Sequence, residues 1–226
     1  VFATSAWGGY SACRQYDEDI QQMREHLAEQ GLPDIEFTKI RQFFDHPKFV
    51  VEMAAAVTEV WGQVPEEKKE STRMLFTAHS VPVAHDNVGG VEGDKNLYSR
   101  QVAEASRLVA SQAGISDYDL VWQSRSGNPR TPWLEPDIVD HTTDIHHNEG
   151  IDTVVVCPIG FISDHMEVIW DLDSELQKAA DEMGVKVLRT RTAGPTPRFA
   201  EMVVDLIDEL EHGREWETSG SVTVQG

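Results

Sequence analysis

Cysteine and basic residues are both scarce in this chain of 226 residues. The two cysteines, Cys13 and Cys157, cannot build the disulfide framework of a small secreted domain, so we expect a reducing, cytoplasmic compartment. The 19 Lys and Arg residues are outnumbered by 39 Asp and Glu residues, which gives a net charge of −20. This balance argues against a nucleic-acid partner and favours the attraction of cations.

Long apolar runs are absent as well. No run reaches the roughly 18 residues that a membrane-spanning helix needs, so we expect no transmembrane segment. The chain starts at Val1 without a Met, and its first residues have the pattern of a strand rather than of a signal peptide. We therefore expect an interior piece of a longer protein.

Apolar runs and helical periodicity alternate along the chain. Strand-like runs occur at 1–5, 36–41, 73–78, 118–123, 152–158 and 185–190. Amphipathic helical patterns occur at 17–30, 47–62, 98–113, 137–148, 164–183 and 197–212. Most of these patterns end at a glycine, as helices commonly do. Strands that alternate with helices are typical of an α/β fold, so the sequence predicts a Rossmann-like parallel sheet with flanking helices.

The helical pattern that follows the run 152–158 carries an acidic stripe. Glu167, Asp171 and Glu175 are spaced four residues apart, so they would share one face of an α-helix. Like charges at this spacing destabilise a helix, which indicates that a cation compensates for them. Because open α/β sheets bind ligands at the carboxyl ends of their strands, the stripe predicts a metal path there. For Asp171 and Glu175 the alternative is a solvated helix face.

A histidine stands at the end of a second strand-like run. His79 directly follows 73–78, where a lone histidine is more often structural than catalytic. If 73–78 and 152–158 are neighbouring strands, however, His79 and Glu167 face one crevice. An imidazole and a carboxylate together can bind a divalent metal ion or transfer a proton.

Two loops are longer than connectors usually are. Residues 83–97 contain three glycines, and residues 124–136 contain three prolines, a glycine, two arginines and a tryptophan. Loops of this length in a compact domain usually bind ligands or cover a site.

Three motifs at these places carry a family resemblance. TAHSVP (77–82), QSRSGNPRTPWLEPDI (123–138) and PIGFISDHMEVIWDLD (158–173) resemble, in this order, the C-terminal part of ferrochelatases. These enzymes insert ferrous iron into a porphyrin. Segments 3–7 and 10–13 are most similar to the actinobacterial branch, for which the expected porphyrin is coproporphyrin III. The resemblance covers nearly the whole chain.

The resemblance implies two similar Rossmann-like domains with a cleft between them, a chelatase-like fold. Residues 1–32 would be the last strand and helix of a truncated first domain, 33–190 the second domain, and 191–226 a C-terminal helix with a tail. We expect the parent protein to be a monomer that acts on porphyrin and ferrous iron, and this fragment alone to be an impaired catalyst.

The resemblance also implies roles for the residues at the strand ends. His79 matches the family's histidine, proposed as proton acceptor and metal ligand, and Glu167 matches its partner carboxylate. Asp171 and Glu175 match an acidic helix face proposed to relay metal ions or protons.

The loop 124–136 resembles the family segment that borders the porphyrin cleft. Trp133 would supply an apolar wall for the porphyrin ring, while Arg125 and Arg130 would bind porphyrin carboxylates. The extra residues 128–131 depart from the shorter loop that is common in the family. The alternative is a rigid surface loop anchored by its tryptophan.

Cys13 raises the question of a cofactor. It matches one ligand of the [2Fe–2S] cluster of actinobacterial relatives, in which three further cysteines lie in a C-terminal extension. Such a cluster takes four thiolates, so two cysteines cannot form it.

Three alternatives to this function stay open. The porphyrin could be protoporphyrin IX. Another type II chelatase could load cobalt or nickel into a tetrapyrrole, although such enzymes tend to use extra histidines where this chain has Glu167. A tetrapyrrole-binding protein without turnover would not need the acidic stripe.

Overall fold

A parallel sheet of four strands forms the centre of the computed structural model, which describes residues 1–9, 15–88, 95–128, 130–194 and 196–213. The strand order is β2-β1-β3-β4, and every neighbouring pair is parallel. The strands are β1 (Thr72–His79), β2 (Tyr118–Gln123), β3 (Thr153–Cys157) and β4 (Lys186–Arg189). Because helices cover both faces, β3 is buried along its whole length, and all its residues after Thr153 are apolar.

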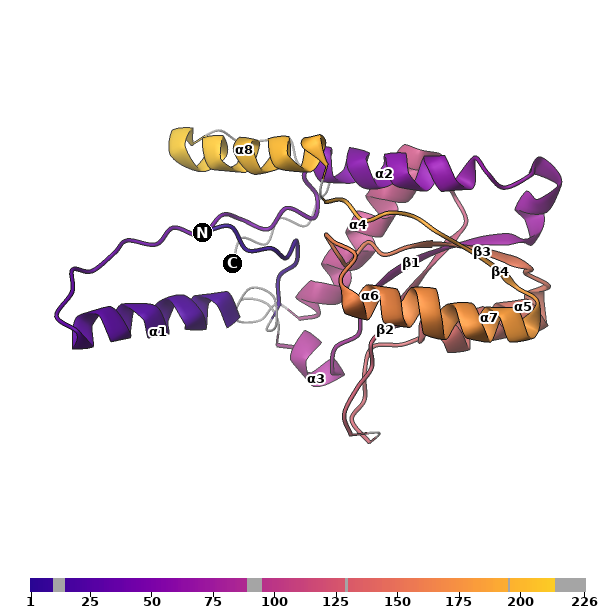
Figure 1. The fold of residues 1–226 in the computed structure, drawn as a ribbon, viewed down its shortest axis with the longest axis horizontal. Coiled ribbons are helices and arrows are strands. Elements are labelled where there is room, and N and C mark those ends of the chain that lie inside the picture. Colours follow the sequence, from indigo (N-terminus) through magenta and orange to yellow (C-terminus); the bar gives the residue numbers. More distant parts are fainter. Residues whose placement is uncertain (10–14, 89–94, 129, 195, 214–226) are drawn as a thin grey trace.

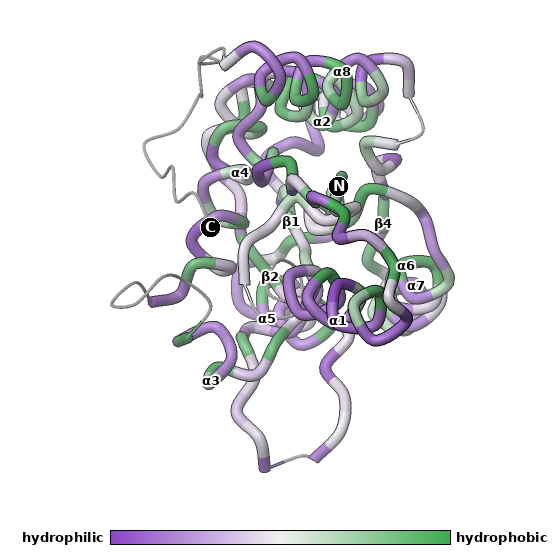
Figure 2. Tube along the Cα trace, turned by 90° about the vertical axis from the view of Figure 1, so that its left-hand side faces the viewer, coloured by the Kyte–Doolittle hydropathy of each residue, from purple (hydrophilic) through white to green (hydrophobic). Residues whose placement is uncertain are grey.

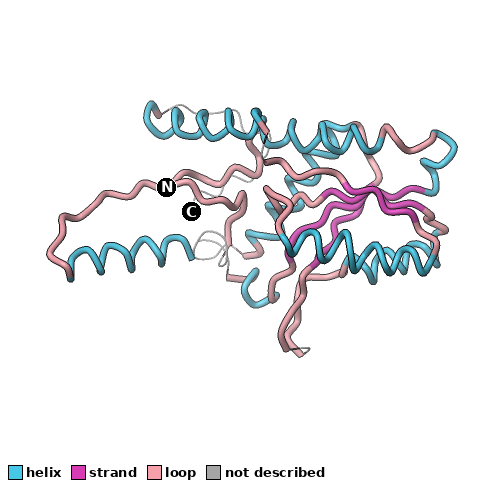
Figure 3. Tube along the Cα trace, viewed as in Figure 1, coloured by secondary structure: helices cyan, strands magenta, loops and turns pink. Residues whose placement is uncertain are grey.

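Helices lie on both sides of this sheet, as Figures 1 and 3 show. One layer contains α2 (Pro47–Trp61), α4 (Leu97–Ala113) and α8 (Pro197–His212). The opposite layer contains α5 (Ile138–Glu149), α6 (Met166–Trp170) and α7 (Gln177–Met183). Met74 and Phe76 of β1 pack toward the first layer, whereas Leu75 packs toward the second. The predicted Rossmann-like α/β class is therefore confirmed.

The expected strands at 1–5 and 36–41 are wrong. Both segments are described, and both are irregular. Two backbone hydrogen bonds connect them: the amino group of Val1 donates to Thr38 O (2.5 Å), and Ile40 N donates to Val1 O (2.8 Å). Since a strand requires a continuous ladder with a neighbour, an apolar run without such a neighbour stays irregular. The other four expected strands are confirmed to within one residue at each end.

The helical region after β3 differs from the expected single α-helix. Between α6 and α7 lies a π-helical segment, η3 (Asp171–Leu176). Because π-helical hydrogen bonds join residues five apart, side chains four apart no longer lie directly above one another. The predicted acidic stripe is therefore interrupted beyond Asp171.

Two helices extend away from the sheet. α1 (Gln15–Glu29) has no buried residue and lies at the end of an extended arm (Figure 1), and both hydrophilic and hydrophobic residues occur on it (Figure 2). α8 packs on α2 through Met202 and Leu206. The remaining short elements are η2 (Glu66–Ser71, a 3-10 helix) and α3 (Val83–Asp86). Among the described residues, none of the helices combines the length and apolarity needed to cross a membrane.

Candidate active site at the carboxyl edge of the sheet

His79 and Glu167 meet at the carboxyl edge of the sheet, as their strand-end positions predict. β1 and β3 are paired neighbours, His79 is the last residue of β1, and Glu167 lies in the first turn of α6, which follows β3. The His79 Nε2 and Glu167 Oε1 atoms are 3.1 Å apart. Their side chains are 37% and 47% exposed, so a ligand can reach both.

The tautomer of His79 follows from a second contact of its ring. Its Nδ1 atom lies within hydrogen-bond distance of the Ser80 carbonyl oxygen. Because a carbonyl oxygen only accepts, Nδ1 must carry a hydrogen, and Nε2 of the neutral ring is left with a lone pair. The contact with Glu167 is then favourable only when one proton lies between Nε2 and the carboxylate. When that proton leaves, the two lone pairs converge, which suits a borderline divalent metal ion.

Gly160 sets the path of the loop between β3 and α6. Its nitrogen donates to Thr77 O (3.1 Å), so the loop runs against the end of β1. A Cβ atom on Gly160 would lie 2.5 Å from Ala78 Cβ, closer than real Cβ atoms approach one another. Only glycine therefore allows the loop to lie this close to the residue before His79.

Asp171 and Glu175 differ in their surroundings. Asp171 is half-buried, and its Oδ2 accepts hydrogen bonds from Gln123 Nε2 (3.1 Å) and from the Ser124 hydroxyl. Ser124 adopts a left-handed backbone conformation (φ 64°), which is uncommon for a residue with a side chain. Glu175 is exposed on η3. Glu167 and Asp171 thus contact the ends of two adjacent strands, whereas Glu175 lies outside this contact network.

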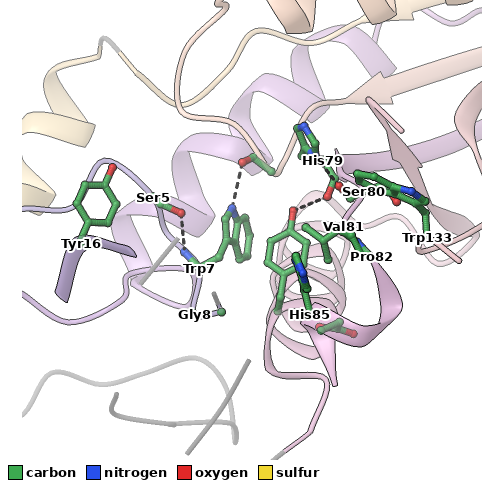
Figure 4. A pocket seen from close by; sticks show the side chains of 14 residues that line it. Ser5, Trp7, Gly8, Tyr16, His79, Ser80, Val81, Pro82, His85 and Trp133 are labelled. Atoms are coloured by element: carbon green, nitrogen blue, oxygen red, sulfur yellow. Dashed lines mark hydrogen bonds between the residues drawn. The ribbon is translucent and has the colours of Figure 1, made fainter. Parts of the chain in front are cut away.

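A pocket of about 470 Å³ opens beside His79 (Figure 4). This volume lies in the usual range for small-molecule sites. Its larger lining side chains are mostly aromatic or apolar, and they include Trp7, Tyr16, Val81, Pro82, Tyr98 and Trp133. The pocket therefore offers a flat, hydrophobic ligand a place next to an imidazole.

Two of the aromatic residues that line this pocket, Trp7 and Tyr98, were not predicted from the sequence. Trp7 Nε1 donates to Gly160 O (3.0 Å), and the Tyr98 hydroxyl donates to His79 O (2.8 Å), as drawn in Figure 4. Burial, together with nearby Asp86, raises the pKa of Tyr98, so its hydroxyl stays protonated and remains a donor. Trp7 lies in the 3–7 segment used for the family resemblance, but nothing in that segment indicated a contact with the strand ends.

The arginines of the loop 124–136 lie apart from the pocket. The loop projects beyond β2 in Figure 1, and Arg125 Nη1 lies 3.7 Å from Glu135 Oε1. Arg125 and Arg130 are exposed, and neither lines the pocket described above. Trp133, at the base of the loop, does line it, and its Nε1 is buried without a hydrogen-bond partner among the described residues. A ligand acceptor would satisfy this donor.

The structure describes only one of the two cysteines, Cys157. Cys13 lies outside the described residues. Cys157 is fully buried in β3, and burial raises the pKa of its thiol to about 12 despite a hydrogen bond with Thr190. Over the described ranges, no group of three or more His, Cys, Asp or Glu side chains is arranged to hold a metal ion. The described residues therefore do not fit an iron–sulfur cluster.

Comparison with known proteins agrees with this geometry. A family model described as ferrochelatase matches residues 1–211. A coproporphyrin III ferrochelatase of Corynebacterium glutamicum is 56% identical over 226 residues, all of this chain and 60% of that protein. Proteins of the same name from Corynebacterium diphtheriae (51% identity; 100% and 63% coverage) and Mycolicibacterium smegmatis (52%; 94% and 60%) are similar. The chain spans about 60% of the length of these relatives. It belongs to the ferrochelatase family.

Proposed function

We propose that the protein containing this chain inserts ferrous iron into coproporphyrin III, a reaction of haem biosynthesis. The observation that carries the proposal is the 3.1 Å contact between His79 Nε2 and Glu167 Oε1 next to a mostly aromatic pocket. The relatives described above, whose printed name is coproporphyrin III ferrochelatase, support the choice of porphyrin. Because the chain spans only part of those relatives, the proposal concerns the longer protein.

The chemistry requires a base and a route for the metal ion. As ferrous iron binds the ring nitrogens, two pyrrole N–H bonds break, two protons leave, and the oxidation state of iron does not change. We propose that His79 Nε2 accepts a pyrrole proton and that His79 and Glu167 contact the incoming iron, since their lone pairs converge once the shared proton is gone. Asp171 and Glu175 would relay metal ions or protons along η3.

The porphyrin would lie in the pocket beside His79. Trp133 would form one wall. Arg125 and Arg130 are exposed on the projecting loop, where they could meet only carboxylates at the rim of a ring that extends out of the pocket. Their role as porphyrin ligands remains part of the proposal.

The test is to replace the two central residues in the full-length protein. We expect His79→Ala and Glu167→Gln to lower the rate of iron insertion by about 10² to 10⁴, the usual contribution of acid–base groups, and to spare porphyrin affinity measured by fluorescence quenching. The control is His141→Ala, which removes the imidazole of a second His–carboxylate pair. That pair joins His141 Nε2 to Asp119 Oδ2 (2.9 Å) at the opposite edge of the sheet.

The same assay separates the alternatives. The two porphyrins differ in that coproporphyrin carries more carboxylates. A higher kcat/KM for coproporphyrin III than for protoporphyrin IX would support the proposed substrate. Faster insertion of cobalt or nickel than of iron would indicate another chelatase. A wild-type protein that binds porphyrin without turnover, or two variants that both retain insertion, would overturn the proposal.

Further parts of the proposal concern the whole protein. We propose that residues 1–32 belong to a first domain, 33–190 form the second domain, and 191–226 form a C-terminal helix and tail. We also propose a monomer in the cytoplasm, since a chain with two cysteines is typical of a reducing compartment. A [2Fe–2S] cluster with Cys13 as one ligand would need three thiolates from residues other than those of this chain.

A further inference from the structure

The first turn of α6 is held only weakly by packing. Of its five residues, only Val168 is buried, while Met166 is 77% and Trp170 is 58% exposed. The following segment, η3, is π-helical, a form that is rare and mostly limited to single turns at functional sites. Something other than the hydrophobic core must therefore fix the direction of Glu167.

Arg189 lies at the end of β4. It forms ion pairs with one residue that precedes Glu167 in the sequence and with one that follows Asp171. Its Nη1 lies 2.9 Å from Asp164 Oδ1, in the loop before α6. Its Nε and Nη2 bind the two carboxylate oxygens of Asp173 in η3, at 2.6 and 3.0 Å. One guanidinium on a strand of the sheet thus joins the segment that precedes Glu167 to the segment that follows Asp171.

The geometry of these contacts is suited to positioning. The Asp173 contact is bidentate, which fixes the carboxylate in the plane of the guanidinium. Arg189 is only 20% exposed, and it also donates to Thr190 O (3.2 Å), so its own side chain is fixed. The carboxylates that Arg189 binds, Asp164 and Asp173, are not members of the predicted acidic stripe but flank it in the sequence.

We propose that Arg189 is a positioning residue for the His79–Glu167 pair: it locks α6 and η3 to the end of β4, so that Glu167 points at His79. The inference rests on the proposed iron insertion, and Arg189 itself does not contact the reacting atoms. Its loss should therefore affect the encounter with iron rather than the binding of porphyrin.

Arg189→Gln in the full-length protein tests this. We expect kcat for iron insertion to fall about tenfold or more and KM for ferrous iron to rise, with KM for porphyrin unchanged, because small misplacements of reacting groups cost this much. Arg189→Lys should recover part of the activity, since lysine keeps the charge but not the bidentate contact. In an Asp164→Asn/Asp173→Asn background, Arg189→Gln should have no additional effect.

The control is Arg73→Gln, which removes a comparable arginine at the amino edge of the sheet. Arg73 is 15% exposed and pairs with Asp119 (3.0 Å) and Glu149 (2.6 Å). Equal kinetic effects of Arg189→Gln and Arg73→Gln, or a lower amount of active enzyme with unchanged KM values, would overturn the positioning role.

A second readout does not depend on the reaction. Hydrogen exchange of the amides of residues 166–171 should accelerate in Arg189→Gln and not in Arg73→Gln. If the wild-type protein fails to insert iron, the proposed function is wrong, yet the exchange measurement still decides whether Arg189 holds this segment. Unchanged exchange at 166–171 would contradict the inference.

Discussion

At the scale of single residues, the contact between Gly160 and Ala78 decides where the loop after β3 can run. Gly160 also accepts the Trp7 Nε1 hydrogen bond through its carbonyl oxygen, so one glycine touches β1 and a wall of the pocket. Since Ala78 is fully buried and precedes His79, the loop cannot move away without disturbing the site.

We expect Gly160→Ala to lower the free energy of unfolding by about 1–3 kcal/mol, the usual cost of overpacking a buried site. Urea unfolding followed by circular dichroism measures the change. Ala78→Gly removes the Ala78 Cβ but leaves the Ala78 Cα, which would lie 2.6 Å from the new Cβ, so Gly160→Ala should remain destabilising in the Ala78→Gly background. A Gly160→Ala variant as stable as the wild-type protein would contradict the collision.

The site was predictable from the sequence only in part. His79 and Glu167 could be named because each follows a strand-like run, and the neighbouring positions of β1 and β3 then bring them together. Tyr98 and Trp7 could not be named, because their hydrogen bonds to His79 O and Gly160 O depend on the packing of distant segments. Strand order and side-chain contacts of this kind have no periodic signal in the chain.

At the scale of secondary-structure elements, the start of α2 contains a buried histidine. His46 Nδ1 accepts a hydrogen bond from Lys48 N (3.1 Å), which requires a ring without a proton on Nδ1. The side chain is 1% exposed. Burial, together with the charges of Arg41 and Lys48, lowers the pKa of His46 to about 4, although Asp205 on α8 opposes the shift.

This pKa predicts a pH dependence of stability. His46 has a pKa of about 6.5 in the unfolded chain, so between about pH 4 and 6.5 the unfolded state binds more protons than the folded state. The free energy of unfolding therefore rises with pH across this window. The contribution of His46, up to about 3 kcal/mol, is present above about pH 6.5 and is lost as the pH falls toward 4.

Urea unfolding at a series of pH values measures this contribution. His46→Asn is the control, because asparagine also caps a helix but does not titrate. The stability of the wild-type protein should fall more steeply than that of the variant below pH 6.5. Parallel pH profiles would show that His46 does not contribute.

The ends of several helices could be predicted from the sequence, whereas the π-helical segment and the irregular segments could not. The ends of α4, α5 and α8 are visible in the sequence because Gly114, Gly150 and Gly213 adopt left-handed conformations just beyond them. The π-helical segment η3 could not be predicted, since its residues have the same amphipathic pattern as an ordinary α-helix. Local propensity likewise could not show that 1–5 and 36–41 lack neighbouring strands.

At the scale of the whole molecule, α1 stands out because no other part of the described chain buries it. None of its residues is buried, and Met23 is 50% exposed. The nearby segment leaves Leu32 and Ile35 about equally exposed. A helix of 15 residues is marginal in water without packing, so we expect α1 to be only weakly stable in this chain alone.

We therefore expect the amides of α1 to exchange rapidly in the 226-residue chain and slowly in the longer protein. Hydrogen exchange followed by mass spectrometry compares the two. α4, whose inner face is buried against the sheet, serves as the internal control and should be protected in both proteins. Strong protection of α1 in the short chain would mean that the helix is stable without an additional partner.

The strand order has a consequence for the timing of folding. His79 and Glu167 are 88 residues apart, and they are brought together by the pairing of β1 with β3. Closing the loop between such non-local residues costs entropy before their contacts stabilise the chain. These pairs therefore tend to form late. A partly folded chain in which only β1 and β2 have paired would already display His79 but would have no carboxylate opposite it. Assembly of the two residues thus coincides with the pairing of β3 with β1, and half-folded chains would not yet present the proposed iron-binding pair to metal ions.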